Sequence, residues 1–427
     1  MIQRRRVWPM ATFGRRDQRG RSRPMNGSSG SVVDFTQGTL GGLVTFTRAA
    51  VTGSGGTGAT YIDSAGNFQL VNTDVPRFNC AFGGGAVRGL LIEAESVNIQ
   101  PRCTWVGGTL PTNWGALFGT GSRAVVTSLY GSADGAVAIQ FTGSAQRPAI
   151  YYSAGDPSIA GSNAFYMASI VVESISSGSV TNLNLLIPNP TGGGVIDSIT
   201  YWRGGVEVSS GTDATTGILG CRFRCTTAGN LQMRIGPGSS GAATVVCALS
   251  RPMVALCEAD SNAPGSWIPT ASFAAVTRPA DFAYVPLGKM PLTGAVGTVV
   301  VGYYRGEGTS TRTPLSILSA VANLVSVGRH AASSTTHTAF DETLTISRTG
   351  QAGLNRAAYT WGGVGTFQAA LSVNGGAAAG DNLAFPTSMT QVRLGAHRSG
   401  EELGAEIAYF AAYEGRTSDA ALAVLST

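Results

Sequence analysis

Apolar and polar residues alternate with a period of two along most of the chain. The alternation is clear in short segments such as LVTFTRA, AVAIQFTG, NLQMRIG and AEIAYFAAYEG, which Gly, Asn, Asp, Ser or Pro separate from one another. Successive side chains of a strand point to opposite faces, so these segments are predicted to be half-buried strands of about five to eight residues. Because no helical pattern of about 12 residues lies between them, we expect antiparallel β-sandwiches and not βαβ units.

Breaks in the alternation divide the chain into segments. Prolines and glycines interrupt it at EADSNAPGSWIPTASFAAVTRPADFAYV, after which a new series of strands begins. We predict a mainly β protein with two antiparallel β-sandwich, or jelly-roll, domains behind an extended basic N-terminal arm. The predicted boundaries are 1–34 for the arm, 35–98 for a β-hairpin collar or connector, 99–262 for the first sandwich, 263–282 for a linker and 283–427 for the second sandwich. Near the end of the chain, Ser418 is predicted to cap a short terminal helix.

The composition agrees with a β protein and places many of the basic residues in the arm. Among the 427 residues 59 are glycine and only 12% are charged, which favours turns and strands of small side chains over helices. Eight arginines and one aspartate lie in the first 24 residues, whereas the whole chain has one lysine, Lys289. The sequence shows neither the apolar stretch of a secretory signal nor the roughly 20 apolar residues of a membrane span. We therefore expect a protein that is made in the cytoplasm and does not enter a membrane.

The six cysteines form no C-x-x-C pair and lie far in sequence from the three histidines. This spacing is not that of a zinc site. In GCRFRC, Cys221 and Cys225 fall on the same face of a predicted strand, and we interpret them as small buried hydrophobic residues, not as a disulfide or metal ligands. We expect no metal and no other cofactor.

Four short motifs follow one another in the connector. They are Phe46-Thr47-Arg48, Ala59-Thr60-Tyr61, Pro76-Arg77-Phe78 and Gly89-Leu90-Leu91-Ile92-Glu93. In this order they resemble a block of tailed-phage and prophage structural proteins. The chain departs from that block in two places: it has the insertion GSGGTG, and it has EAESVN where the block usually has Gln-Arg-Thr-Asn. Phe78 is predicted to pair with the Leu-Leu-Ile run as a hairpin. The hairpin is either a collar that fixes the arm to the first sandwich or to neighbouring subunits, or an ordinary edge hairpin.

Three later segments extend the resemblance. TLPTNWGALFG (109–119) resembles the start of the sandwich that often follows the block, SWIPTASFAAVTRPAD (266–281) resembles its closing linker, and 392–425 resembles the last hairpin and helix of a concanavalin A-like lectin domain. The resemblance implies a virion protein, a head spike or a tail-fibre or tail-spike subunit of a phage or gene transfer agent. It also implies a carbohydrate-binding-like first sandwich, a lectin-like second one, and binding of host surface polysaccharide for attachment. We expect a homo-oligomer that assembles in the bacterial cytoplasm.

The arm is predicted to anchor the protein to capsid or tail proteins. The residues expected to do so are Arg4, Arg5, Arg6, Trp8, Arg15 and Arg16. They can thread an acidic groove of such a partner and order on assembly, or they can neutralise the phosphates of packaged DNA. We favour the protein groove, because the rest of the chain has no surplus of basic residues, and we expect no nucleic acid partner.

Two aromatic segments are candidate carbohydrate sites. Tyr201, Trp202 and Arg203 precede two glycines, and Tyr359 and Trp361 precede GGVG. A sugar has one apolar face and a rim of hydroxyls, which suits an aromatic platform with polar neighbours, but the same rings also suit core positions. We expect Trp361 to be the better platform, because the C-terminal jelly roll is expected to lie farthest from the arm and to reach the host first.

The sequence contains no recognisable catalytic motif. Acidic residues cluster in FDET (340–343) and SGEELGAE (399–406), where paired carboxylates for polysaccharide hydrolysis would be sought. Both clusters lie among polar residues of predicted hairpins or loops, and we interpret them as solvated turns. The sequence has no G-x-S-x-G, H-E-x-x-H or P-loop motif. We therefore expect a protein that is not an enzyme, while a polysaccharide-degrading spike and a decoration protein without receptor binding stay as alternatives.

Overall fold

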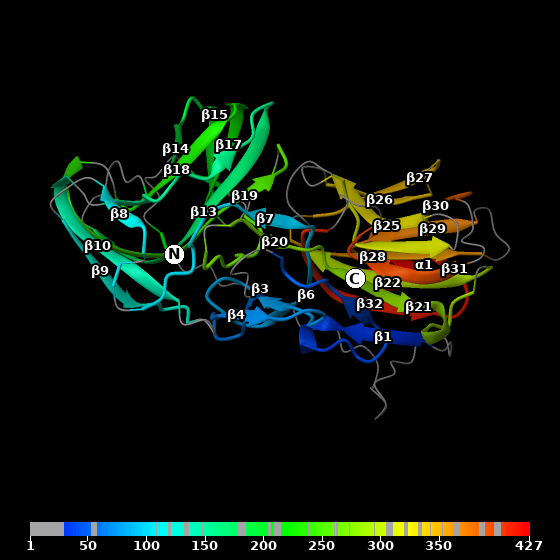
Figure 1. The fold of residues 1–427 in the computed structure, drawn as a ribbon. Helices are drawn as coiled ribbons and strands as arrows, with labels where there is room; N and C mark the ends of the chain where they lie inside the picture. Colours follow the sequence, from blue (N-terminus) through cyan, green and yellow to red (C-terminus); the bar gives the residue numbers. More distant parts are fainter. Residues whose placement is uncertain are drawn as a thin grey trace, which may run out of the picture.

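Two β-sandwiches, joined by a group of shorter strands, make up the computed structural model of the chain (Figure 1). The structure describes residues 30–52, 58–107, 109–110, 112–117, 121–131, 136–146, 149–177, 185–203, 206–208, 215–237, 240–259, 261, 264–272, 274–293, 295–304, 311–319, 323–331, 335–341, 343–351, 353–362, 368–383, 389–396 and 403–427. The predicted anchoring residues Arg4, Arg5, Arg6, Trp8, Arg15 and Arg16 lie outside these ranges.

The second sandwich consists of two sheets of eight strands each. One sheet runs β30 (Ala379–Asp381), β29 (Ala369–Val373), β28 (Leu354–Trp361), β22 (Gly297–Tyr304), β32 (Ala405–Tyr413), β6 (Val87–Ile92) and β5 (Phe78–Cys80), and β1 (Gly30–Asp34) also pairs with β32. The other runs β2 (Thr45–Thr47), β21 (Phe282–Pro286), β31 (Met389–Leu394), β24 (Leu315–Ser319), β25 (Asn323–Ala331), β26 (Thr336–Phe340) and β27 (Thr345–Thr349), and β23 (Thr311–Arg312) pairs with β25.

The first sandwich has a nine-stranded and a five-stranded sheet. The larger runs β16 (Val206–Val208), β15 (Val195–Arg203), β17 (Gly217–Thr227), β13 (Ala164–Ser177), β19 (Ser240–Cys257), β10 (Val137–Gln146) and β9 (Ser122–Thr127), with β7 (Ser96–Asn98) and β20 (Val276–Arg278) at its side. The smaller runs β12 (Ser158–Ile159), β18 (Gly229–Ile235), β11 (Ala149–Tyr152) and β8 (Trp114–Leu117), and β14 (Leu186–Thr191) also pairs with β18. All pairings of the named strands are antiparallel, as predicted.

The alternation of apolar and polar residues in the sequence determines which side chains point into each core. In β17, Cys221, Phe223 and Cys225 are buried, and in β18, Leu231 and Met233 are buried while the residues between them are partly exposed. These side chains pack with those of the facing sheet in one apolar cluster of the first sandwich, and the second sandwich has a separate cluster between its own two sheets. Cys221 and Cys225 are both fully buried in the cluster of the first sandwich, as their interpretation as small packing residues predicts.

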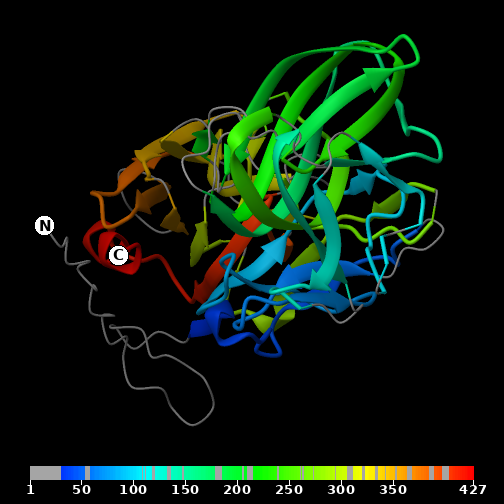
Figure 2. The ribbon, with the colours of Figure 1, turned by 90° about the vertical axis from the view of Figure 1, so that its left-hand side faces the viewer.

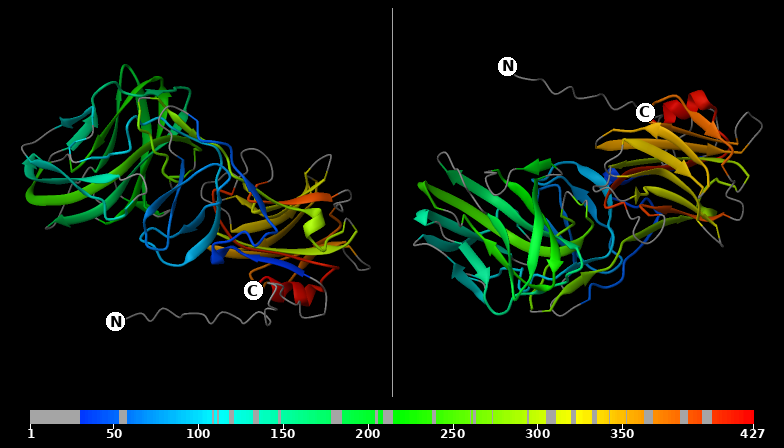
Figure 3. Two further views of the ribbon diagram at one scale, coloured as in Figure 1. Left: turned by 60° about the horizontal axis from the view of Figure 1, so that its bottom comes forward. Right: turned by 90° about the horizontal axis from the view of Figure 1, so that it is seen from above.

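From Gly30, where the described residues start, the chain runs in the second sandwich, leaves it to build the first, and then returns. β1 pairs with β32, β2 pairs with β21, and β6 pairs with β32, so the segment 35–98 contributes strands to both sheets of the second sandwich. The predicted hairpin exists, with Phe78 opposite Leu90. The structure nevertheless differs from the predicted collar, because the connector strands belong to the sandwich formed by the end of the chain. Figure 3 shows these strands, in blue, between the two lobes.

A small two-stranded hairpin lies at the joint between the sandwiches. It is formed by β3 (Ala59–Ile62) and β4 (Phe68–Val71). Ile62 and Phe68 of the hairpin share an apolar cluster with Val171 and Met253 of the nine-stranded sheet and with Trp267 of the linker. The hairpin therefore covers part of the outward face of that sheet.

Short helical segments complete the second sandwich. Two 3-10 turns, η1 (Phe35–Gln37) and η2 (Leu287–Lys289), flank its strands, and α1 (Asp419–Leu425) lies beside the sheet of β28 and β29 (Figure 2). Ser418 caps α1, as predicted, by accepting a hydrogen bond from the Ala421 amide at 3.4 Å. No helix among the described residues is long and apolar enough to span a bilayer.

Candidate functional site

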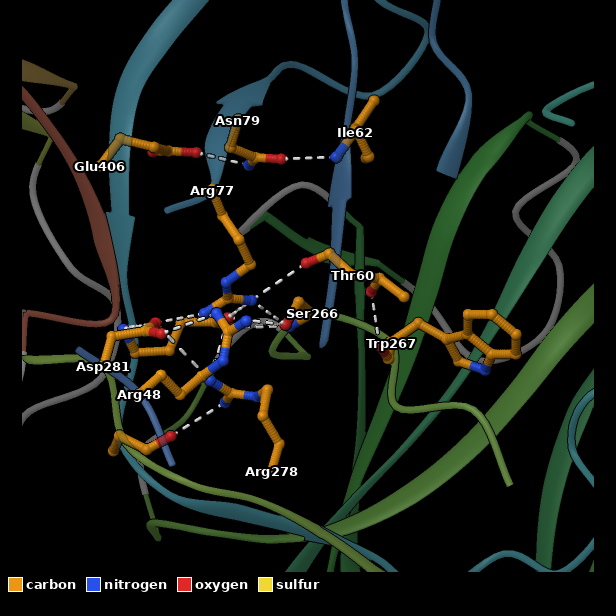
Figure 4. Close-up of polar contacts among 12 residues, drawn as sticks. Arg48, Thr60, Ile62, Arg77, Asn79, Ser266, Trp267, Arg278, Asp281 and Glu406 are labelled. Carbon is orange, nitrogen blue, oxygen red and sulfur yellow. Dashed lines mark hydrogen bonds and ion pairs between the residues drawn. The ribbon is translucent and has the colours of Figure 1, made fainter. Parts of the chain in front are cut away.

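Five charged side chains form a buried ion cluster at the joint (Figure 4). It consists of Arg48, Arg77, Arg278, Glu93 and Asp281, each no more than 6% exposed. Arg77 Nη1 donates to Glu93 Oε2 at 2.6 Å, and its Nη2 pairs with Asp281. Arg48 Nη1 lies 3.2 Å from Asp281 Oδ1, and Arg278 Nη1 lies 3.4 Å from Glu93 Oε2. Three arginines therefore share two carboxylates away from water.

Each member of the ion cluster is the last residue of a strand or lies within two residues of a strand end. Arg48 follows β2, Arg77 precedes β5, Glu93 follows β6, Arg278 ends β20, and Asp281 precedes β21. The sheets bring these strand ends together although Arg48 and Asp281 are 233 residues apart in the chain. The side chains of three of the four connector motifs thus meet those of the segment 266–281.

Main-chain groups and one hydroxyl complete the ion cluster. Ser266 donates from its amide and its hydroxyl to the Glu93 carboxylate, at 2.8 and 2.6 Å. Arg77 Nη1 also donates to the Thr60 carbonyl at 3.0 Å, and the Thr60 hydroxyl donates to the Trp267 carbonyl. Hydrogen bonds from these groups offset the loss of hydration that buried charges suffer. They also attach the β3–β4 hairpin and the linker to the second sandwich.

The electrostatics of the ion cluster keep Glu93 ionised. Burial by itself would raise the pKa of Glu93, but Arg278, Arg77 and the two hydrogen bonds from Ser266 lower it to about 2. Taking an ion out of water costs several kcal/mol, so such a network stabilises the fold only while all its members are present. Removing one partner of a buried pair typically costs about 3–5 kcal/mol.

A second buried ion pair lies between the nine-stranded sheet of the first sandwich and the same hairpin. Arg251 Nη1 is 3.1 Å from Glu173 Oε1, and the hydroxyls of Ser128 and Ser250 donate to the same carboxylate oxygen. The Arg251 guanidinium also lies over the ring of Phe68, 4.4 Å from its centroid. The hairpin is therefore held on one side by the five-membered ion cluster and on the other by Arg251.

A cleft of about 490 Å³ opens between the two sandwiches above these groups. Its volume is that of many small-ligand sites, which prefer such domain boundaries. Met167, Ile218 and Met253 supply apolar lining from the nine-stranded sheet, and four arginines and four glutamates also line it.

Most carboxylates of the cleft are held by arginines. Arg312 Nη2 of the second sandwich lies 2.8 Å from Glu258 Oε2, just after β19, and so bridges the two sandwiches. Arg88 lies 3.2 Å from Glu406, which also accepts a hydrogen bond from the Asn79 amide at 2.8 Å.

The structure overturns the prediction that Trp361 and Tyr359 form a surface platform. Both side chains are 0% exposed in the core of the second sandwich, and their rings stack on each other with centroids 5.9 Å apart. Trp361 Nε1 donates to the Thr293 carbonyl at 3.3 Å. A ring with no exposed face cannot stack on a sugar. β28 is buried on both sides, because one face packs on the opposite sheet and α1 covers part of the other.

The other aromatic segment is divided between the core and the surface. Tyr201 is 7% exposed and donates its hydroxyl to the Leu186 carbonyl at 3.0 Å, so it is a core residue and not part of a platform. Trp202 is partly exposed on the outward side of β15, with the Arg222 guanidinium 5.5 Å from its ring centroid. Arg203 is partly exposed as well. Trp202 and Arg203 therefore stay candidate binding residues.

The acidic clusters have structural partners where the structure describes them. The Asp341 carboxylate accepts hydrogen bonds from the amides of Thr343 and Leu344, at 2.9 and 2.6 Å, and so holds its own turn. Glu406 belongs to the ion pair with Arg88. Glu342, Glu401 and Glu402 lie outside the described residues.

The ion cluster was not predicted from the sequence, although the sequence contains a signal for it. Arg48, Arg77 and Glu93 each stand next to an apolar segment, where a charged residue at a strand end has to be solvated or paired. The partners Arg278 and Asp281 follow some 185 to 230 residues later. The alternation within one segment cannot predict which distant residues pair with its charged ends.

Comparisons with known proteins give little similarity. No known protein family matches the chain, and no curated protein matches it either. Among solved structures, the chain is similar to the N-terminal CBM22-1–CBM22-2 tandem domain of Xyn10C from Paenibacillus barcinonensis, with a TM-score of 0.21 and 12% sequence identity. The match covers 77% of this chain and 99% of that one. The fold of this protein is defined by the strand pairings described above.

Replacing Trp361 with Ala should destabilise the protein strongly. The change removes a fully buried ring from the second core, and such truncations typically cost about 3–5 kcal/mol. Chemical denaturation measures the free energy of unfolding. Trp202→Ala, at a partly exposed position, is the matched control and should lower it by much less. Equal stability of the Trp361→Ala variant and the unmodified protein would contradict the core assignment.

Replacing Glu93 with Gln should lower the melting temperature at neutral pH and change its pH dependence. The pKa of Glu93 lies below its unfolded value, so its contribution to stability is complete above about pH 4.5 and is lost as the pH falls through about 2. The difference in melting temperature between the unmodified protein and Glu93→Gln should therefore narrow below about pH 4.5. Glu95→Gln, at an exposed position lining the same cleft, is the control and should follow the unmodified protein. A difference that stays constant with pH would show that Glu93 is not held ionised by its arginines.

Proposed function

We propose that the chain is a non-enzymatic attachment protein of a phage-like particle, a head spike or a tail-fibre subunit. In this proposal it binds host surface polysaccharide through its β-sandwiches and is held on the particle by its arginine-rich arm. The arm residues Arg4, Arg5, Arg6, Trp8, Arg15 and Arg16 would contact capsid or tail proteins, and several copies of the chain would assemble together.

The buried ion cluster is the observation that carries the proposal. Arg48, Arg77 and Glu93 come from three of the four motifs that resemble the phage block, and Arg278 and Asp281 come from the segment that resembles its closing linker. These matched positions contact one another across the fold. The resemblance therefore coincides with a physical unit, a joint that fixes one sandwich to the other. A protein that carries load between a particle and a cell surface needs such a joint.

The electrostatics of the cleft favour binding over hydrolysis. Polysaccharide hydrolysis with two carboxylates usually needs one of them as an acid with a raised pKa. In the cleft the pKa of Glu93 is lowered to about 2, and Glu258 and Glu406 are paired with Arg312 and Arg88. Glu93 therefore stays ionised near neutral pH and cannot serve as that acid.

The position of β1 reverses the expected orientation of the two sandwiches. β1 starts at Gly30 and pairs with β32, so the preceding arm is connected to the second sandwich. This pairing differs from the expectation that the C-terminal jelly roll lies farthest from the anchor. The reason is that β1 pairs with the end of the chain and not with the strands that follow it in sequence. In the proposed function the first sandwich is the part that faces the host.

Incubation of the purified protein with surface polysaccharides of candidate host bacteria tests the proposal. We expect saturable binding without any shortening of the polysaccharide, measured by co-sedimentation and by size-exclusion chromatography of the glycan. Shortening would support a depolymerase instead, and neither binding nor shortening would leave a decoration protein.

A truncated chain separates attachment to the particle from recognition of the host. Deleting residues 2–24 should leave polysaccharide binding unchanged, because the two sandwiches have their own cores. The same deletion should abolish incorporation into particles, measured by immunoblotting of purified particles. Normal occupancy of the truncated chain on particles would show that the arm is not the anchor.

A further inference from the structure

We infer that the outward face of the five-stranded sheet in the first sandwich binds a neutral oligosaccharide segment, with Tyr151 as its stacking platform. The inference rests on the proposed function and adds to it a site and a class of ligand. The face is formed by β8, β11, β18 and β14, which lie side by side.

One row of residues crosses this sheet from edge to edge. Gly115 on β8 is opposite Tyr151 on β11, Tyr151 is opposite Arg234 on β18, and Arg234 is opposite Ile187 on β14. Each of the four is partly exposed, whereas their neighbours along the strands, such as Trp114, Ile150 and Met233, point into the core. The row therefore faces outward, away from the apolar cluster of the sandwich.

The glycine in this row makes room for the Tyr151 ring. A Cβ atom at Gly115 would lie 3.4 Å from Tyr151 Cε1, so the ring edge reaches over the position where a side chain would stand. The added Cβ would also lie 3.3 Å from Ser153 Cβ, so a side chain longer than that of alanine would compete with the ring for this space. Tyr151 is only partly exposed, as is expected for a ring that leans on the sheet and presents part of its surface to solvent. Such a ring offers the apolar surface on which a pyranose can stack.

Amide side chains stand beside this platform. Gln232 and Asn189 are opposite each other on β18 and β14, one row further along the sheet, and diagonal neighbours of this kind lie about 7–8 Å apart. Gln232 Oε1 accepts a hydrogen bond from Arg234 Nε at 3.0 Å, which orients the amide. Within the described residues, the Asn189 amide has no hydrogen-bond partner. An amide offers both donors and acceptors, and so matches vicinal sugar hydroxyls.

The charges on this face favour a neutral glycan over a nucleic acid. Arg234 is the basic residue of the row, and Asp156, which accepts a hydrogen bond from Thr191 at 2.5 Å, is an acidic residue at the same sheet. A polyanion such as nucleic acid needs a surplus of positive charge, which this arrangement does not supply. A neutral sugar needs a platform and a few convergent polar groups.

The location of the face agrees with recognition of a host. The nine-stranded sheet of the same sandwich carries the β3–β4 hairpin and the linker on its outward side, where a shared apolar cluster is buried. The outward side chains Tyr151, Gln232 and Asn189 belong to no such cluster among the described residues. They lie on the sandwich to which β1 does not belong (Figure 1).

Titration of single variants against an immobilised panel of neutral and acidic bacterial polysaccharides tests the inference. Tyr151→Ala should weaken binding of the best neutral polysaccharide by about tenfold, in line with the loss of one stacking contact. Tyr151→Phe keeps the ring and should bind as the unmodified protein does. Asn189→Ala should weaken binding a few-fold, and thermal melting should show that all three variants are folded.

Tyr284→Ala provides the matched control, because Tyr284 is a partly exposed tyrosine on β21 of the second sandwich, away from the proposed face. It should leave binding unchanged. Loss of binding in Trp202→Ala with normal binding in Tyr151→Ala would overturn the inference while the proposed function stands. Preference for acidic polysaccharides would also overturn it. If the unmodified protein binds no polysaccharide, the proposed function itself fails.

Discussion

Three arginines and two carboxylates that leave water together determine how the two sandwiches are joined. Burying any one of these ions alone would cost several kcal/mol. The Arg77–Glu93, Arg77–Asp281 and Arg48–Asp281 pairs offset that cost. They can form only because the ends of β2, β5, β6, β20 and β21 meet at one point. The remaining positive charge is solvated by main-chain carbonyl groups, including that of Ala94, which accepts a hydrogen bond from Arg278 at 2.9 Å. Formation of the joint therefore requires the connector, the linker and the second sandwich to be in place at the same time.

This constraint connects the fold to the proposed role. The linker that closes the first sandwich is fixed to the second by Glu93 and Ser266, and Arg312 adds a second bridge through Glu258. The first sandwich is then held in a defined direction relative to β1, from which the arm departs. A binding face on the five-stranded sheet would be presented to the host in a constant orientation, and the force on a bound glycan would pass through buried ion pairs and not through a flexible linker.

The sequence predicted the elements much better than their partners. Alternation identified the strands and the antiparallel class, the apolar blocks around Phe78 and Leu90 identified the β5–β6 hairpin, and local chemistry identified the Ser418 cap. The sequence did not reveal which distant strands pair with each other. The alternation in β1 and β6 would look the same beside a strand near in sequence as it does beside β32, close to the C-terminus. For the same reason the aromatic ring of Trp361 was misassigned: its burial depends on the opposite sheet, with which it shares the core of the second sandwich. The ion cluster was missed because Arg48, Arg77 and Glu93 find Arg278 and Asp281 only across about 185 to 230 residues of sequence.

Small-angle X-ray scattering of the full chain and of its Arg77→Ala variant tests the central claim most directly. Arg224→Ala, which removes a partly exposed ion pair with Asp197, serves as the control. If the buried ion cluster fixes the two sandwiches, the unmodified protein and the control should scatter alike, and Arg77→Ala should show a larger radius of gyration and the curve of two bodies that move independently. An Arg77→Ala variant with unchanged scattering and unchanged melting temperature would contradict the account.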